Sequence, residues 1–283
     1  MKNKHISLST KMFLGNILPL IFASTFIIGS FLIVLKKTIN TDIEKITETS
    51  IENLDSKISA IIQEYETQID HLRNIVKEKH NKETADLATK ALTVNMPEDF
   101  ALYYGTLISR YEPGGFYSDS SGWNPDADWL PPERPWFQDA VKNSGEFAIT
   151  DPYVDTMTNS ICTTISKDVK DENNKLLGVA AIDIILNNLS TAMADIKISE
   201  NAKAYIVNAD GLFITNDDTS FLMEKSIFDE SEFKKHSFNK TNFFNLSNII
   251  IKGGIFYGVC KSSSTPWYIV AYGPVSDFTK NSY

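Results

Sequence analysis

The chain has 283 residues, enough for one large or two medium domains, and a net charge of −9. Its apolar and charged fractions of 42% and 22% exclude an intrinsically disordered chain and predict a packed core. Residues 1–37 hold five Lys and no acidic residue, which leaves 22 basic against 36 acidic residues and a net charge of −14 for the remainder. This acidic body argues against a nucleic-acid surface, because phosphate recognition requires a basic patch.

The N-terminal region has the pattern of a membrane anchor. Residues 1–11 are short and basic, and residues 12–35 contain no charged side chain over 24 positions, enough for a tilted spanning helix. A cleaved signal peptide, with an apolar region of about 7 to 15 residues, is the alternative. Basic residues without acids before the span predict that 1–11 is cytoplasmic and that the body lies outside the cytoplasmic membrane.

Residues 38–92 are predicted to form one long stalk helix. Apolar side chains recur there at spacings of three or four, which produces a single stripe: Ile51, Leu54, Ile58, Ile61, Tyr65, Ile69, Leu72 and Val76. The stripe either packs on the chain's own domain or forms the seam of a homodimer, and the part nearest the membrane favours the seam.

Two hairpin-rich α+β units are expected after the helix, because short apolar runs alternate with turn residues. The first unit covers residues 93–195 and contains a short helix at 135–142 and a strand pair over 161–184. The second covers 200–275 and repeats this texture more weakly. Residues 276–283 are expected to lead into a second membrane span beyond the C-terminus.

Hairpins in the second unit are predicted from its turn residues. The turn at Asn208–Gly211 joins predicted strands at 204–207 and 212–215, and Lys252–Gly254 joins 248–251 to 255–261. A last strand is expected at 267–272.

One stretch concentrates residues that suit ligand binding. Between Trp129 and Asp183, an arginine, several aromatic rings and carboxylates fall at expected turn and strand-end positions. The planar fork of Arg134 matches a carboxylate, while Asp155 and Asp183 suit an ammonium group. Aromatic walls would add cation–π attraction of about 0.5 to 2 kcal/mol. Asp183 interrupts an apolar run, so its carboxylate requires a partner, either a ligand ammonium or Arg134.

Each candidate also has a purely structural interpretation. Arg134 could form a salt bridge with Glu133 or Asp139, and Trp136, Phe137 and Tyr153 could be core rings. Asp151 precedes a proline and is expected to be a turn residue.

Catalysis and metal binding have weaker support. Asp151, Asp155 and Asp183 could form the carboxylate set of a glycoside hydrolase, but the sequence has no G-x-S-x-G, H-E-x-x-H or P-loop. Residues 124–128 lack the spacing of a known Ca²⁺ loop, so we expect no enzyme, metal or cofactor. Cys162 and Cys260 fall in different units and are expected to be buried small side chains, with a disulfide between them as the alternative.

The chain resembles the double Cache (dCache) sensor domains of bacterial methyl-accepting chemotaxis receptors and sensor kinases. The similarity covers about residues 12–275 and rests on DWLPPERPWF, DPYVDT and GVAAIDI, whose residue types and spacings both agree. It implies two PAS-like antiparallel-sheet subdomains after the long helix, with a ligand pocket in the membrane-distal one. The implied ligand-binding residues are Trp129, Arg134, Trp136, Phe137, Tyr153, Asp155 and Asp183.

The same resemblance assigns roles and exposes two departures. It implies that Arg134 binds a ligand carboxylate and Asp183 a ligand amino group, with Tyr153 and Asp155 supplied by an opposite loop. Trp129 and Phe137 stand where the amino-acid-binding subset has tyrosines, so both lack the expected hydroxyl. The ligand class therefore stays open between amino acids and other amines.

The expected function is the extracytoplasmic ligand-sensing region of a transmembrane chemoreceptor, a homodimer that binds a small amino acid or amine and signals across the membrane. The input domain of a sensor kinase or cyclase is the main alternative. An anchored hydrolase and a dimer scaffold with an empty pocket are the others.

Overall fold

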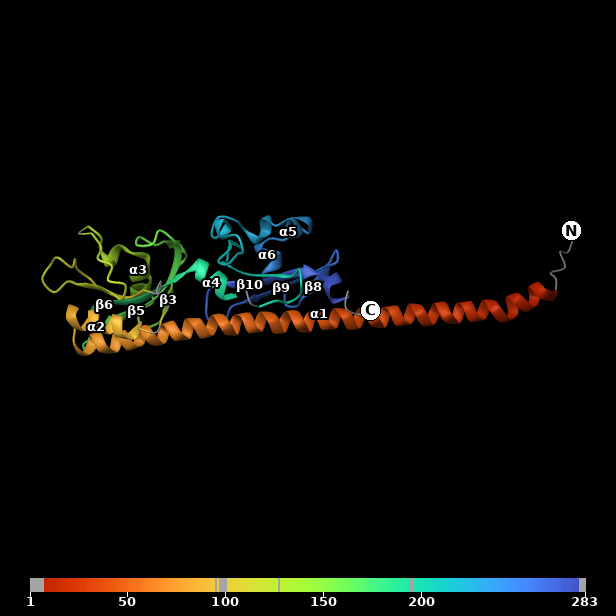
Figure 1. Ribbon diagram of the computed structural model, residues 1–283, viewed down its shortest axis with the longest axis horizontal. Coiled ribbons are helices and arrows are strands. Elements are labelled where there is room, and N and C mark those ends of the chain that lie inside the picture. The colour runs from red at the N-terminus through yellow and green to blue at the C-terminus, as the bar shows by residue number, and fades with distance from the viewer. Residues whose placement is uncertain (1–7, 95, 97–100, 127, 194–195, 280–283) are drawn as a thin grey trace.

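The computed structural model describes residues 8–94, 96, 101–126, 128–193 and 196–279. Helix α1, Leu8–Glu78, has 71 residues and runs beneath two sheet-containing units that lie side by side along its C-terminal half (Figure 1). The predicted end segments 1–11 and 276–283, and the border of the first unit at 194–195, lie partly outside the described residues.

The apolar N-terminal part of α1 projects beyond both units (Figure 1). Among the described helices, α1 is the one long and apolar enough to cross a membrane. Its side chains there are exposed, with Phe26 at 77% and Ile33 at 71%, and no protein covers them. The helix continues through Lys36 and Lys37, so the predicted span and the predicted stalk are parts of one rod.

The predicted single helix over 38–92 is wrong in one respect, because the structure divides it. Helix α1 ends at Glu78, and a second helix, α2, covers Lys82–Leu92. Asn81 is the N-cap of α2, and its side chain accepts a hydrogen bond from the Thr84 backbone N–H at 2.9 Å. An asparagine cap satisfies an N–H that a starting helix leaves without a partner. The chain therefore turns here and α2 packs back against α1.

The apolar stripe of α1 packs on the chain's own units. Its buried side chains join one core with both sheets, and they are Ile43, Ile51, Leu54, Ile58, Ile62, Ile69, Leu72 and Val76. Ile62 takes the buried position that the sequence analysis gave to Ile61. Past Leu35, the large apolar side chains exposed on the described part of α1 include Ile46 and Ile75.

The sheet farther from the N-terminus, here called the distal sheet, has six antiparallel strands. Their order is β2-β1-β6-β5-β3, with β4 also paired to β5. The strands are β1 Leu102–Thr106, β2 Tyr117–Asp119, β3 Ala148–Ile149, β4 Tyr153–Val154, β5 Ile161–Lys170 and β6 Leu176–Ile185.

The central strand β6 shows how the two faces of the distal sheet differ. Side chains alternate between faces along a strand, so Ala180, Ile182 and Ile184 lie in the core shared with α1. Val179 and Ala181 belong instead to a second apolar cluster with helix α3, Pro135–Lys142. The same alternation places Asp183 on the α3 face, at the edge of this second cluster.

The proximal sheet has four antiparallel strands in the order β7-β10-β9-β8. They are β7 Lys203–Val207, β8 Ile250–Lys252, β9 Ile255–Lys261 and β10 Tyr268–Pro274. Helix α4, Leu186–Met193, connects the two sheets, and the short helices α5, Ser231–Lys235, and α6, Lys240–Phe243, cover the proximal one. The 3₁₀ helix Val275–Phe278 returns to contact α1.

Two local predictions for the proximal unit need correction. Residues 212–215 form isolated bridges in place of the predicted strand: Val207 with Phe213, Leu212 with Ser226, and Phe213 with Leu222. Cys260 is exposed, whereas Cys162 is buried as expected, and both are free thiols. The α+β fold class, a long helix followed by two antiparallel-sheet units, is confirmed.

Candidate functional site

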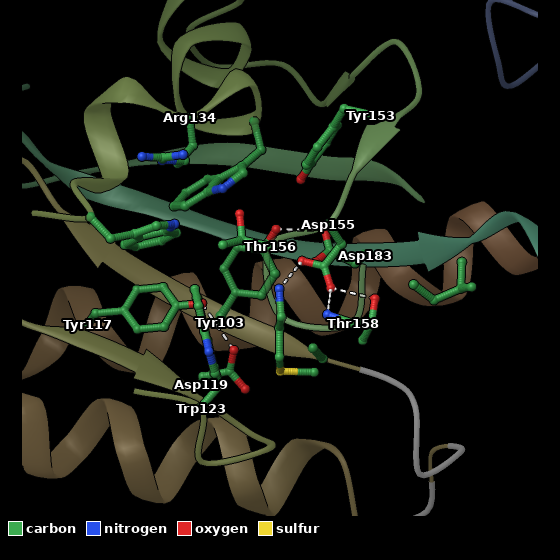
Figure 2. Close-up of a pocket in the computed structure, with 15 residues that line it drawn as sticks. Tyr103, Tyr117, Asp119, Trp123, Arg134, Tyr153, Asp155, Thr156, Thr158 and Asp183 are labelled. Atoms are coloured by element: carbon green, nitrogen blue, oxygen red, sulfur yellow. Dashed lines mark hydrogen bonds between the residues drawn. The ribbon is translucent and has the colours of Figure 1, made fainter. Parts of the chain in front are cut away.

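Six of the seven candidate residues line one pocket on the α3 face of the distal sheet (Figure 2). They are Trp129, Arg134, Trp136, Tyr153, Asp155 and Asp183. Five further lining residues that matter below were not singled out from the sequence: Tyr103, Tyr117, Asp119, Trp123 and Met157. The pocket thus combines one arginine with three carboxylates and six aromatic rings.

Phe137, the seventh candidate, does not line this pocket. Its side chain is 4% exposed and packs against Trp136 with ring centroids 5.6 Å apart. Adjacent residues of a helix point about 100° apart, so Trp136 and Phe137 point in different directions. Phe137 is a core ring between α3 and the sheet.

Prolines position the segment that carries Arg134. Pro131–Glu133 forms a 3₁₀ helix, and Pro135 occupies the first position of α3, where its missing N–H is not needed. Pro131 packs directly on β1 at Gly105, where an added Cβ would lie 2.7 Å from the Pro131 Cβ. Ser166 of β5 donates a hydrogen bond to the Trp136 carbonyl oxygen at 2.8 Å. These contacts fix Arg134 between two helices above the sheet.

The Arg134 guanidinium has only weak partners in the described structure. Its Nη2 lies 3.9 Å from an exposed Glu133 carboxylate, and its Nε donates to the Leu130 carbonyl oxygen at 3.4 Å. The guanidinium carbon lies 5.3 Å from the Trp129 ring centroid. The ion pairs of the described residues do not join Arg134 to Asp139 or Asp183, so the fork stays available to a carboxylate.

Asp183 is held by two hydroxyl groups on one oxygen. Tyr103 of β1 donates to Oδ1 at 2.7 Å, and Thr164, its cross-strand neighbour on β5, donates to the same atom at 2.5 Å. Within the described residues, the hydrogen bonds of Asp183 leave Oδ2 without a donor. Oδ2 is therefore a free acceptor at the pocket wall.

Removal from solvent raises the pKa of Asp183 to about 7, against the lowering effect of the Thr164 and Tyr103 hydrogen bonds. Repulsion from Asp155 and Asp119 raises this pKa further. Burial therefore disfavours the ionised form of this carboxyl, and a neighbouring cation would lower its pKa.

A hydroxyl chain extends from Asp183 to Tyr153. Tyr153 and Thr164 lie 2.6 Å apart, oxygen to oxygen. Because Thr164 has one hydroxyl proton and donates it to Asp183, the Tyr153 hydroxyl donates to Thr164. Tyr153 thus braces Asp183 through Thr164, and its ring closes the pocket beside β4.

Asp155 shapes the loop that follows β4. Its Oδ2 accepts hydrogen bonds from the Thr158 backbone N–H and hydroxyl, both at 2.6 Å, and Oδ1 accepts from the Met157 N–H at 3.2 Å. A side chain that caps its own loop in this way forms an Asx turn. Asp155 lines the pocket and at the same time fixes residues 155–158 over it (Figure 2).

Asp119 is a third carboxylate that the sequence analysis missed. It ends β2, is 6% exposed, and accepts hydrogen bonds from the Tyr117 hydroxyl at 3.0 Å and the Ser121 N–H at 2.8 Å. Burial is the largest cause that raises its pKa. In the sequence, a carboxylate at a strand end followed by Ser-Ser-Gly is the pattern that could have indicated Asp119 as a site residue.

Trp129 carries an indole N–H at the position where the resemblance implies a tyrosine hydroxyl. Its indole Nε1 is buried and has no hydrogen-bond partner in the described part of the chain. A buried donor without a partner is unfavourable by about 1 to 3 kcal/mol. The ring packs edge-to-face on Tyr117 and Trp123, with centroids 5.0 and 5.1 Å away.

The free space inside the pocket is small. The free space between its side chains is about 30 Å³, room for one or two waters, whereas ligand sites commonly provide about 300 to 1,000 Å³. The loops after β2 and β4 contact each other, with the Ser121 hydroxyl 3.5 Å from the Met157 sulfur. A ligand larger than the free space requires residues of the lining to move.

The lining provides groups that suit ligand binding. Its described residues include no His, Lys or Cys, and the described chain has no group of three or more His, Cys, Asp or Glu that could hold a metal ion. A carboxylate with a free oxygen, an unpaired guanidinium and aromatic walls match an ammonium, a carboxylate and an apolar body.

Comparison with known sequences identifies the family. The sequence model of the Cache domain matches residues 34–282. McpA of Bacillus subtilis, a methyl-accepting chemotaxis protein, is 29% identical over 166 residues, which is 57% of this chain and 23% of McpA. PscA of Pseudomonas syringae, also a methyl-accepting chemotaxis protein, is 24% identical over 191 residues, 67% of this chain and 28% of PscA. The chain spans less than a third of the length of either relative.

Solved structures share the fold. The ligand-binding domain of the amino acid chemoreceptor PctC of Pseudomonas aeruginosa, in complex with GABA, superposes with a TM-score of 0.62 at 17% identity, covering 81% of this chain and 97% of that one. The ligand-binding domain of CtaA of Pseudomonas fluorescens, with L-leucine, gives 0.63 at 18% identity, covering 86% and 100%.

Proposed function

The chain belongs to the Cache domain family, and from this premise we propose that it is the ligand-sensing region of a membrane-anchored chemoreceptor. Its distal pocket binds a small amine-bearing molecule, an amino acid or an amine, and passes the signal across the membrane. The observation that carries this proposal is Asp183, whose Oδ1 is saturated by Tyr103 and Thr164 while Oδ2 has no donor within the described residues.

The proposed roles follow from the contacts. A ligand ammonium binds Asp183 Oδ2 with Asp155 nearby, and a ligand carboxylate binds the Arg134 fork and the Trp129 indole N–H. Tyr103 and Trp136, whose ring centroids lie 5.0 Å apart, form the apolar wall. Two charge-assisted contacts of about 1.5 to 3 kcal/mol each, plus apolar burial, are compatible with micromolar binding.

The placement in the membrane is part of the same proposal. The apolar part of α1 spans the cytoplasmic membrane, residues 1–11 are cytoplasmic, and both sheets lie outside the cytoplasm. A second span follows the C-terminal residues, which is supported by the return of Val275–Phe278 to α1. The active form is a homodimer along α1, with Ile46 and Ile75 available on the helix surface.

Calorimetry on the full chain in lipid nanodiscs tests the site. We expect saturable binding of at least one ligand from a panel of amino acids and amines, lost in Arg134→Ala for carboxylate ligands and in Asp183→Ala for all. Lys142→Ala and Asp128→Ala, which remove exposed charges outside the lining, are the matched controls and should bind as the wild type does. Normal binding by both pocket variants would contradict the assignment.

A further inference from the structure

The pocket holds more acidic side chains than a simple amino acid can pair. Among its described lining residues, Asp119, Asp155 and Asp183 are acidic and Arg134 is the one cation. With all four ionised the formal charge is −2, and a zwitterionic ligand leaves that value unchanged. A ligand with an additional positive charge makes the formal charge less negative. The reduced dielectric of the pocket strengthens the attraction between that charge and the carboxylates.

Asp119 is the carboxylate that the proposed roles do not use. It is 6% exposed, and within the described residues no ion pair reaches it. The Ser121 N–H and hydroxyl both donate to Oδ1, at 2.8 and 2.5 Å, which accounts for a turn after β2. Among the hydrogen bonds of the described residues, Oδ2 receives that of the Tyr117 hydroxyl, at 3.0 Å. A neutral asparagine would serve the same turn, so the turn alone does not explain a buried charge here.

The charged groups are spread along the pocket rather than gathered at one point. In Figure 2, Arg134 lies at the top of the view and Asp119 at the bottom, with Asp155 and Asp183 between them in height. Asp119 lies beside Tyr117 and Trp123, whose ring centroids are 5.8 Å apart. Carboxylate and aromatic faces together form a favourable environment for an ammonium or guanidinium group.

We propose that the ligand carries two cationic groups, one bound at Asp183 and the other at Asp119 beside the rings of Tyr117 and Trp123. A basic amino acid fills the sequence Arg134, Asp183, Asp119 with its carboxylate, α-ammonium and side-chain cation, and an aliphatic diamine fills the last two positions. This inference rests on the proposed function, since it assumes that the distal pocket is the ligand site.

Matched ligand pairs test the second cation without altering the protein. Calorimetry on the full chain in nanodiscs compares 1,4-diaminobutane with 1-aminobutane, and L-lysine with L-norleucine, so that each pair differs by one amino group. The doubly cationic member of at least one pair should bind about 10- to 100-fold more tightly, the effect of one charge-assisted hydrogen bond.

The Asp119→Asn variant assigns that preference to its residue. The asparagine keeps an acceptor for the Ser121 donors, so the turn is preserved, and the variant should lose the preference while its affinity for the singly charged member changes less than about threefold. Asp128→Asn, on the exposed part of the same loop, is the control and should retain the preference.

The outcomes separate this inference from the proposed function. Tight binding of neutral amino acids with no preference for the second cation would overturn the inference alone. Retention of the preference in Asp119→Asn would also overturn it. If the wild type binds no ligand of either pair and no neutral amino acid, both the proposed function and the inference fall.

Discussion

Replacing Asp183 with asparagine should abolish amine binding and at the same time stabilise the fold. Asparagine keeps an acceptor oxygen for the hydroxyl groups of Tyr103 and Thr164, which both bond Oδ1 in the wild type. It removes the negative charge that an ammonium requires. It also removes a carboxylate that burial and the neighbouring Asp155 and Asp119 disfavour in its ionised form.

The size of the stabilisation follows from the pKa of Asp183. Folding raises it from 3.8 to about 7, so between these values the folded protein binds more protons than the unfolded chain, and wild-type stability falls as the pH rises. A shift of about 3 units corresponds to an upper limit of about 4 kcal/mol, and partial solvent access reduces this to about 2 to 4 kcal/mol. The asparagine variant should gain this amount at pH 8 and almost nothing at pH 4, where the wild-type carboxyl is protonated.

Urea unfolding at pH 4, 6 and 8 measures this difference. Trp123, Trp129 and Trp136 surround the pocket, so tryptophan fluorescence reports mainly on the distal unit. Comparing the two proteins at each pH cancels the contributions of the other titrating groups. The reasoning would be refuted by a variant that is less stable than the wild type at pH 8. A stability difference between variant and wild type that is the same at all three pH values would also refute it.

Three further predictions concern binding and packing. Affinity for an amine should fall about tenfold per pH unit below pH 7, because Asp183 must lose its proton to accept an ammonium. From pH 7 to 8 the affinity should stay level. Equal affinity at pH 5 and pH 8 in calorimetry would contradict this prediction. Trp129→Phe should lower the affinity for carboxylate-bearing ligands about tenfold and leave the affinity for amines without a carboxylate unchanged. Binding of L-lysine and of 1,5-diaminopentane measures the two effects. An equal loss of affinity for both would count against the indole N–H as a carboxylate donor. Gly105→Ala should destabilise the distal unit by about 1 to 3 kcal/mol in urea unfolding, since the new Cβ would lie 2.7 Å from Pro131. Gly29→Ala is the control, because its new Cβ meets no atom within 4 Å. Equal stability of the two variants would show that Pro131 can shift freely.

The fold was predictable because its periodicities are strong. The three- and four-residue spacing in α1 marks the face that packs on both sheets, and the break at Asn81 carried a capping signal that the sequence analysis overlooked. Pro135 marked the start of α3, which begins and ends at the predicted residues, Pro135 and Lys142. Residues 212–215 have strand composition, yet they pair for only two residues, because pairing depends on partners that local sequence does not specify.

The pocket was less predictable because it depends on three-dimensional neighbours. Six candidates converge, but Phe137 turns into the core since a helix cannot direct adjacent side chains to one place. Tyr103 and Thr164 come from strands on either side of Asp183, and only the strand order brings them to its carboxylate. Asp119 lies outside the motif, ten residues before Trp129, and reaches the pocket through β2 pairing with β1.

Asp183 is connected to the long helix through α4. Asp183 lies two residues before the end of β6, and α4 begins at the next residue after that strand, with no linker to absorb a shift. At the far end of α4, the Ala192 carbonyl oxygen accepts a hydrogen bond from the Lys57 ammonium of α1. A ligand can shift a conformational equilibrium only by its differential affinity for the two states. Under the proposed function, an ammonium bound at Asp183 acts on the strand that runs directly into α4, and the raised pKa of this carboxyl sets the size of that interaction at about 2 to 4 kcal/mol. We therefore expect Asp183 to be the residue through which ligand binding reaches α1.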